Sequence, residues 1–353
     1  MAYLPLSTAN LPDPAIDPAQ GKSPADYFDI DTYAGTSATH ERSNFTFQPD
    51  WLWFKRRSGA DNHIVNDVIR GAGKDLKTNE TGAEGTATTS LLSFDADGFT
   101  LGTGGDLNQS GQTFVAWAWK AGTSVSGSTT GSGTSQSYTG SVSTISGFGI
   151  IGYAGNATAG HSIPHHLDSA PEVVIVKRRT GADNWAVTTP DVNRLYLNGT
   201  NDAASINYNW ADQDGSVVTL NGTDAFMNAT SNTYIMYCFH SVEGFSKFSS
   251  YVGNGDPDGP FVYTGFRPSF VMIKCSSAAS TFWIMFDVER DTYNVMDTYL
   301  QAQASNAESS FPFIDYVSNG FKHRHNSSHT NTSGQTYIYM AFAENPFKYS
   351  NAR

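Results

Sequence analysis

The amino-acid sequence predicts an all-β protein made of three tandem, jelly-roll-like β-sandwich modules, with an extended proline-rich arm at the N-terminus. Three observations lead to this prediction. A motif recurs along the chain, the apolar residues come in short runs rich in β-branched and aromatic side chains, and long helical patterns are missing.

The repeat is clearest in a lysine-arginine-arginine motif. Residues 55–62 return as residues 177–184 with a single change of serine to threonine. A third copy keeps Lys274, but cysteine and serine replace the two arginines. A proline precedes each lysine, and a threonine-led apolar run closes each copy. Recurrence of this kind is typical of a repeat architecture.

The repeat divides the chain into five parts, and each module has the size of a small domain. The parts are the arm at 1–26, module 1 at 27–122, a linker at 123–147, module 2 at 148–244, and module 3 with the C-terminal tail at 245–353.

The two junctions between modules differ. Gly, Ser and Thr dominate residues 123–147, a composition that predicts a flexible linker without a core. Only Val242, Glu243 and Gly244 separate modules 2 and 3. We therefore expect modules 2 and 3 to pack rigidly together, and module 1 to be offset from them.

Several predicted strands are apolar on both faces. In residues 51–54, 173–176 and 270–273 the apolar side chains do not alternate with polar ones. In a sandwich strand with one solvent-exposed face, apolar and polar side chains would alternate. Both faces of these strands are therefore expected to be buried. The cover is either a neighbouring module or another subunit. The alternative is a central strand covered by its own loops.

Composition narrows the function classes. The chain carries 21 Lys and Arg against 33 Asp and Glu, and the basic residues are scattered, which argues against a nucleic-acid partner. No apolar stretch is long enough to span a bilayer, and the N-terminus lacks the regions of a signal peptide. We therefore expect no membrane insertion, folding in a cytoplasm, and free thiols at Cys238 and Cys275.

Prolines recur through the first 26 residues, which show little periodicity. Such a segment favours an extended conformation with nothing of its own to pack on. Ahead of repeated sandwiches we expect an arm that docks on a larger assembly. The alternative is a loose tail.

No pattern nominates a catalytic centre. The acidic clusters lie mostly in Asp-Gly turn dipeptides, which are favoured there for their backbone conformations. Asp287, Glu289 and Asp291 would share a strand face, which suits either a calcium ion or a solvated strand edge. Nucleophile-elbow, phosphate-loop and metalloprotease motifs are missing. The sequence therefore predicts a protein that is not an enzyme.

His323 and His325 are the candidate metal ligands. In a strand they face the same side, and in a three-fold assembly three such pairs would offer six imidazoles to one octahedral metal ion. The alternative is an exposed polar strand, because the corresponding residues of modules 1 and 2 are not histidine. No other cofactor is expected. Those corresponding residues are Leu101, Thr103, Val218 and Leu220.

The repeated basic motif has two interpretations. It could contact anionic glycans or nucleic acid, or its arginines could pair locally with aspartates to brace a hairpin. Recurrence at the same place in two modules favours the brace, although each exposed ion pair contributes little to the stability of the fold. The residues of the predicted brace are Lys55, Arg56 and Asp61 in module 1, and Lys177, Arg178 and Asp183 in module 2.

Four segments give the chain a resemblance to a known family: residues 47–57, 97–102, 261–268 and 339–347. In these it resembles the repeated sandwich module of tail-fibre and other virion proteins of marine tailed bacteriophages, over nearly everything after residue 27. The resemblance implies a surface component of a virion, usually trimeric, with a fibre or host-attachment role more common than an enzymatic one. It transfers no catalytic residues.

The sequence and the resemblance together predict a virion structural protein, made in the host cytoplasm, that acts as a tail fibre docking by its N-terminus. Its partners would be other virion proteins, copies of itself in a homotrimer, and host-surface glycan or protein. A capsid decoration protein, cement or head fibre, is the alternative within this class. A glycan-degrading appendage enzyme is the alternative from another class, which the fold alone does not license.

Overall fold

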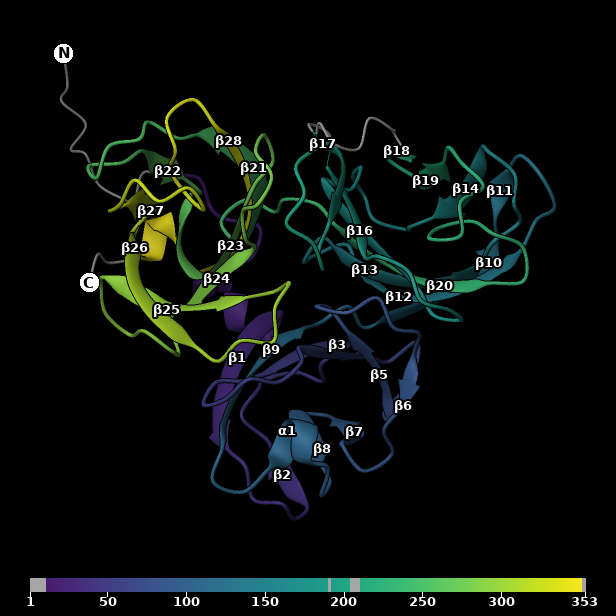
Figure 1. Ribbon diagram of the computed structural model, residues 1–353, viewed down its shortest axis with the longest axis horizontal. Helices are drawn as coiled ribbons and strands as arrows, with labels where there is room; N and C mark the ends of the chain where they lie inside the picture. Colours follow the sequence, from purple (N-terminus) through teal and green to yellow (C-terminus); the bar gives the residue numbers. More distant parts are fainter. Residues whose placement is uncertain (1–10, 190–191, 204–209, 351–353) are drawn as a thin grey trace.

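The computed structural model describes residues 11–189, 192–203 and 210–350. Across them the regular secondary structure is almost entirely antiparallel β-strand, with one short α-helix, α1 (Gly105–Asn108). Figure 1 shows three lobes around a common centre, one for each predicted module. The all-β prediction is confirmed.

Module 1 pairs a six-stranded sheet with a three-stranded sheet. The larger sheet faces the centre of the molecule, and the smaller sheet lies at the outer end of the lobe (Figure 1). The larger sheet runs β1 (Phe28–Ala34), β9 (Thr113–Trp119), β3 (Trp51–Arg56), β4 (Ile64–Asp67), β5 (Lys74–Lys77) and β6 (Gly85–Thr86), and the smaller sheet β2 (His40–Arg42), β8 (Gly98–Leu101) and β7 (Leu91–Asp95).

Module 2 has the same plan, with a seven-stranded and a four-stranded sheet. The larger sheet runs β10 (Thr123–Ser128), β12 (Ser137–Ser143), β13 (Phe148–Ala154), β20 (Thr233–Phe239), β15 (Val173–Arg178), β16 (Ala186–Thr189) and β17 (Val192–Tyr196), and the smaller sheet β11 (Thr130–Gly131), β14 (His161–Pro164), β19 (Val217–Leu220) and β18 (Ala211–Gln213).

Module 3 forms one continuous eight-stranded order that folds over its own core, because β23 contacts both β26 and β27. The order is β21 (Ser246–Val252), β28 (Thr336–Pro346), β23 (Phe266–Cys275), β24 (Ile284–Asp287), β25 (Met296–Gln301), β26 (Ser309–Val317), β27 (Gly320–His323) and β22 (Phe261–Tyr263).

A tyrosine-x-glycine motif closes the first core strand of each module, in β1, β13 and β21. The hydroxyls of Tyr33, Tyr153 and Tyr251 donate to loop carbonyls at 2.9, 2.8 and 2.7 Å. A Cβ on the glycine two residues later would lie within 2.5 Å of a backbone oxygen in every copy. Glycine is therefore required there because two backbone segments approach too closely for a side chain.

One hydrophobic core runs through all three modules. Trp119, Phe239 and Phe342 take the same position in β9, β20 and β28, and each is at most 2% exposed. The Phe342 ring lies 5.7 Å from Trp119 and 6.2 Å from Phe239. Neighbouring modules thus cover the two-faced strands. Of the alternatives that the sequence left open, the neighbouring module is correct.

The predicted flexible linker at 123–147 is wrong, and so is the offset of module 1. Strands β10 and β12 pair with each other, and β12 pairs with β13. Most of β10 is exposed, so its Ser, Thr and Gly content reflects an edge strand and not a lack of structure. Module 1 packs directly on module 2, where Trp51 stacks on Tyr237 at 4.6 Å.

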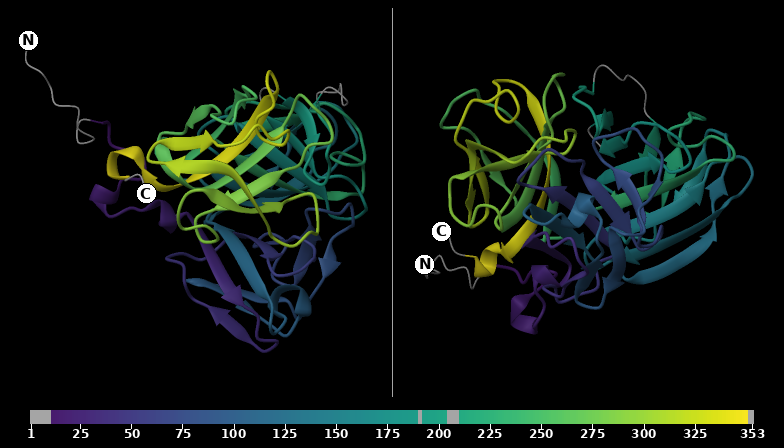
Figure 2. Two further views of the ribbon diagram at one scale, coloured as in Figure 1. Left: turned by 60° about the vertical axis from the view of Figure 1, so that its left-hand side comes forward. Right: turned by 60° about the horizontal axis from the view of Figure 1, so that its bottom comes forward.

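The predicted arm packs on its own chain over residues 11–26; residues 1–10 lie outside the described part. Ile16 is fully buried in the central core. Asp17 accepts a hydrogen bond from the Tyr349 hydroxyl at 2.7 Å, and Asp13 forms an ion pair with Lys348. Figure 2 shows the two 3₁₀ turns of this segment, η2 (Pro18–Gln20) and η3 (Pro24–Asp26), on the side of the molecule that carries η4 (Phe347–Tyr349). The expectation that the arm has nothing of its own to pack on is wrong for these residues.

Alanine at Gly140 tests whether residues 123–147 are a fixed part of module 2. A Cβ there would lie 2.5 Å from Ile151 Cδ1 and 2.6 Å from the Ile150 carbonyl oxygen. We therefore expect Gly140→Ala to lower the free energy of unfolding by roughly 1–3 kcal/mol in urea denaturation. Ser126→Ala on the exposed edge strand is the control and should change it by less than about 0.5 kcal/mol. Equal stability of the two variants would contradict the strand pairing.

Candidate functional site

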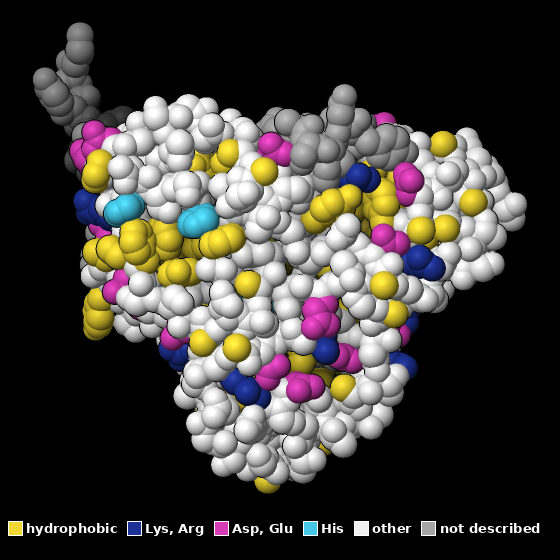
Figure 3. Space-filling model, in the orientation of Figure 1, with side chains coloured by type: hydrophobic (Ala, Val, Ile, Leu, Met, Phe, Trp, Pro, Cys, Tyr) yellow, Lys and Arg dark blue, Asp and Glu magenta, His cyan; other side chains and the backbone are white. Residues whose placement is uncertain are grey.

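Charged residues gather where the modules meet. On the face shown in Figure 3, basic and acidic side chains cluster where the lower lobe, module 1, joins the two upper lobes. At these boundaries, arginines of the repeated motif pair with glutamates of neighbouring modules. The interfaces between modules are therefore the candidate functional site.

The lysine of the motif closes a hairpin in every module. Lys55, Lys177 and Lys274 are fully buried, and burial lowers the pKa of each ammonium group to about 8. Their Nζ atoms donate to backbone carbonyls at the ends of the hairpin, those of Arg56, Arg178 and Thr281, at 2.7, 2.8 and 3.0 Å. The lysine is the part of the motif that all three modules keep, because each turn needs this donor.

The first arginine forms the brace predicted from the sequence. Arg56 pairs with Asp61 at 2.9 Å, and Arg178 pairs with Asp183 at 3.4 Å. All four side chains are partly exposed. The local pairing is confirmed.

The second arginine crosses to another module, which the sequence analysis missed. Arg57 of module 1 donates to both carboxylate oxygens of Glu308 in module 3, at 2.9 and 3.1 Å. Arg179 of module 2 holds Glu84 of module 1 in the same way, at 2.8 and 3.2 Å. Two-point pairing of this kind fixes orientation as well as distance.

Two buried ion pairs lie behind these contacts, and we call them the locks. Arg70 Nε donates to Asp67 Oδ2 at 2.6 Å in module 1, and Arg290 Nε donates to Asp287 Oδ2 at 2.6 Å in module 3. All four side chains are 0% exposed. Each guanidinium also donates to a backbone carbonyl two residues before its aspartate, at 2.8 and 3.0 Å.

An aromatic ring from a neighbouring module completes each lock. The Tyr237 hydroxyl of module 2 donates to Asp67 at 2.7 Å, and the Trp117 indole of module 1 donates to Asp287 at 2.9 Å. Both rings are fully buried and stand at the same position of β20 and β9. Module 2 is thus locked to module 1, and module 1 to module 3.

The interface between modules 2 and 3 has no such lock, and we call it the open interface. Thr189 stands at the end of β16 where the locks have aspartate, and Met340 takes the ring position. Ser276 and Ala203 replace the crossing arginine and glutamate, but the backbone bond between them remains at 2.8 Å. The Trp283 indole still donates across this interface, to the Tyr196 carbonyl at 2.9 Å.

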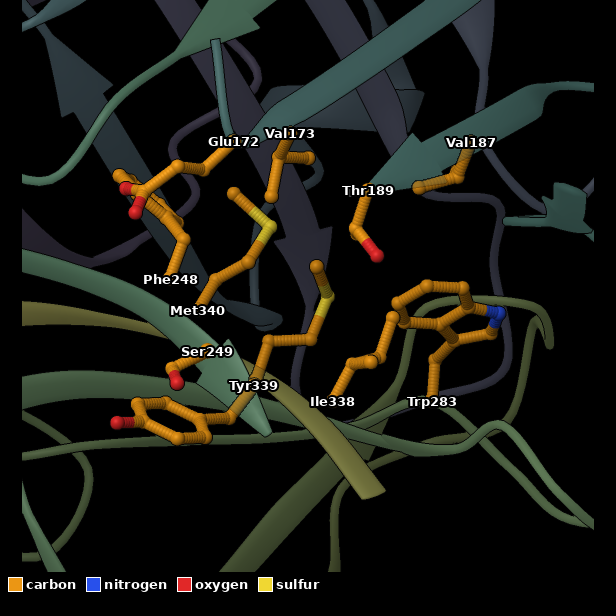
Figure 4. A pocket seen from close by; sticks show the side chains of 11 residues that line it. Glu172, Val173, Val187, Thr189, Phe248, Ser249, Trp283, Ile338, Tyr339 and Met340 are labelled. Carbon is orange, nitrogen blue, oxygen red and sulfur yellow. The ribbon is translucent and has the colours of Figure 1, made fainter. Parts of the chain in front are cut away.

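A cavity of about 190 Å³ lies in the open interface. Figure 4 shows side chains from both modules around it, with the Thr189 hydroxyl pointing into the space and Trp283 at one end. Most of the lining is apolar, so the cavity suits an apolar ligand and offers few groups for catalysis. The central lining residues are Val187, Thr189, Phe248, Met272, Trp283 and Met340.

The metal site predicted at His323 and His325 is not built as expected. His323 is 0% exposed inside module 3, with its ring 4.8 Å from Tyr251, so it cannot reach an ion shared between subunits. His325 packs edge-on against Phe311 at 4.6 Å. The sequence suggested His323 and His325 as metal ligands because residue spacing alone does not show which strand face is buried.

The acidic triplet does not form a calcium site either. Asp287 belongs to a lock, while Asp291 accepts from the Thr298 hydroxyl at 2.7 Å. Within the described ranges, no group of three or more His, Cys, Asp or Glu side chains could hold a metal ion. Cys238 and Cys275 are buried free thiols, as predicted.

The fold and the interfaces define an all-β protein of three quasi-equivalent modules that share one core. The family described as Domain of unknown function (DUF7483) matches residues 23–346, and the chain therefore belongs to this family. No curated protein and no solved structure matches the chain. No helix in the described part of the chain is long and apolar enough to cross a membrane.

Removing one partner of a lock should be far more damaging than removing a brace. We expect Asp67→Ala to lower the free energy of unfolding by about 3–5 kcal/mol, because it removes the carboxylate that the buried Arg70 and Tyr237 side chains bond and leaves Arg70 only the more distant Glu84, at 3.8 Å. Asp61→Ala, which breaks a partly exposed pair, should cost less than about 1 kcal/mol. Urea denaturation measures both, and similar losses would show that Asp67 and Arg70 do not act as a buried pair.

His323 should make the protein sensitive to acid. Burial, with Lys322 nearby, lowers the pKa of His323 to about 3, whereas the unfolded chain protonates it near pH 6.5. Stability present above pH 6.5 is therefore lost as the pH falls toward 3, by about 1.4 kcal/mol per pH unit. His323→Leu matches Leu101 and Leu220, which end the equivalent strands β8 and β19. Denaturation at several pH values should show a shallower acid loss in the variant, and identical slopes would refute this role.

Proposed function

We propose that the chain is a non-enzymatic structural protein of a bacteriophage virion, a tail fibre or a similar appendage that contacts the host surface. The observation that carries the proposal is the role of the charged residues that lie at the interfaces between modules. The second arginine of the repeated motif and the two locks hold modules together, as a rigid structural part requires. The resemblance to virion proteins of marine tailed phages supports a location on the virion.

Module 3 is the best candidate for the contact surface. Five of the seven large hydrophobic residues exposed in the described ranges belong to it. Figure 3 shows a hydrophobic band on this lobe, with two histidine side chains along one edge. Exposed aromatic side chains are enriched in interaction surfaces because they combine apolar area with a polar group. The five residues are Val252, Phe261, Tyr263, Tyr293 and Val295.

The N-terminal segment supports docking at one end of the body. Residues 11–26 are fixed against the C-terminal strand β28 and η4, so a virion partner that holds this segment would also orient module 3. A homotrimer would need other surfaces than the two-faced strands, because those faces are buried inside one chain. Exposed residues of module 3 supply most of the remaining apolar candidates for contacts between copies.

Localisation on the virion tests this function directly. An antibody against the recombinant chain, coupled to gold, is applied to purified virions from the culture that carries the gene. We expect label on the tail or its fibres. Label confined to the head would replace the fibre by a capsid decoration protein, and no label on any virion would overturn the structural role.

Surface variants test the proposed contact region. We expect Tyr263→Ser with Tyr293→Ser to lower binding of the chain to host cells at least fivefold without loss of stability, because these side chains are 61% and 71% exposed. Leu92→Ser, at a hydrophobic residue of module 1 that is 42% exposed, is the control. Equal binding by all variants would remove module 3 as the contact surface. Release of reducing ends from host polysaccharide would instead favour the glycan-degrading enzyme.

A further inference from the structure

The open interface lacks a ring that the other two interfaces contain. Tyr237 and Trp117 fill equivalent positions at the locks, and both are fully buried. Strand pairing puts Met340 at the third equivalent position, opposite Met272 of β23. A methionine side chain has neither a flat ring nor a hydrogen-bond donor. The cavity in this interface therefore lies where the missing ring would pack.

The acceptor for that ring is still present. Thr189 stands at the position of Asp67 and Asp287, which accept from the Tyr237 hydroxyl and the Trp117 indole. Its Oγ1 is buried and forms no hydrogen bond in the described structure. Figure 4 shows this hydroxyl pointing into the cavity. A buried hydroxyl without a partner is unfavourable, so a ligand that supplies a donor gains affinity.

The size and walls of the cavity suit one aromatic ring. Its volume is about 190 Å³, and an engineered apolar cavity of about 150 Å³ in another protein binds benzene. Met272 and Met340 supply adaptable apolar walls, and Val187 adds a further apolar side chain. The Trp283 ring is held in place by its bond to the Tyr196 carbonyl. Glu172 also lines the cavity, which disfavours anionic ligands.

We propose that this cavity binds a single uncharged aromatic ring carrying an O–H or N–H donor, of the phenol or indole class. The ring takes the place that Tyr237 and Trp117 fill at the locks, and its donor bonds to Thr189 Oγ1. The ring comes either from a free small molecule or from a tyrosine or tryptophan side chain of another protein. The inference rests on the open interface and does not depend on the proposed virion role.

Binding of p-cresol and toluene to the full chain tests the proposal, because the two rings differ only in the hydroxyl group. We expect p-cresol to bind more tightly in a titration followed by NMR. Thr189→Val keeps the side-chain shape but removes the hydroxyl, and should weaken p-cresol about fivefold without changing toluene. Equal affinity for both rings, or no effect of Thr189→Val, would overturn the proposed hydrogen bond.

Filling the cavity from within gives a second, independent test. Met340→Tyr supplies the missing ring and should abolish p-cresol binding, whereas Met340→Leu should leave binding within about twofold, since Leu and Met have similar volumes. Unchanged binding to Met340→Tyr would place the ligand elsewhere and refute the site. If Met340→Tyr fails to fold, the Thr189→Val comparison still decides.

N-acetyl-tyrosinamide distinguishes the two sources of the ring. Binding of this compound, lost in Met340→Tyr, supports a tyrosine side chain from a partner. Binding of p-cresol alone, with the amide excluded, supports a free small aromatic molecule. Failure of p-cresol, indole and the amide to bind at millimolar concentration would overturn the proposal.

Discussion

The aromatic core shared by three modules is the constraint on which the rest of the structure depends. Each module carries a large sheet that is apolar on both faces, and its own smaller layer covers only one of them. Trp119, Phe239 and Phe342 meet at the centre and bury the other faces against one another. A single module would expose that surface to water, so the chain folds as one body and not as three independent domains.

The locks orient the modules around this core, and their chemistry explains why the open interface differs in several residues at once. A buried ion pair is expensive to desolvate and is tolerated only with complete pairing, so losing one member leaves an unpaired charge. At the open interface the aspartate, the crossing arginine and its glutamate are all replaced, by Thr189, Ser276 and Ala203. Replacing only some of these residues would leave a charged side chain without its partner, which is the least stable arrangement. Two interfaces therefore carry a lock with a crossing ion pair, and the open interface carries uncharged residues at the same positions.

The repeat in the sequence was enough to predict the number of modules, the strand-rich fold and the local brace, because these depend on residues close together in the chain. The crossing pairs escaped prediction, since Arg57 and Glu308 are 251 residues apart. An Asp-x-x-Arg spacing at residues 67–70 and 287–290 was a readable signal for the locks. Composition misled at β10, where polar residues belong to an exposed edge strand. The spacing of the two histidines misled at His323, whose side chain is buried.

Because the three modules belong to one chain, their interfaces can differ from one another, whereas those of a trimer of identical chains cannot. In a symmetric trimer any substitution appears at all three interfaces, so replacing a ring by methionine would remove every lock together. Within one chain, two interfaces remain locked by Tyr237 and Trp117 and hold the body together, while the third is free to change. Its backbone bonds keep the modules at the same separation, so the loss of a ring leaves a cavity and does not collapse the interface. Quasi-symmetry therefore allows one interface to specialise for binding at little cost to the fold.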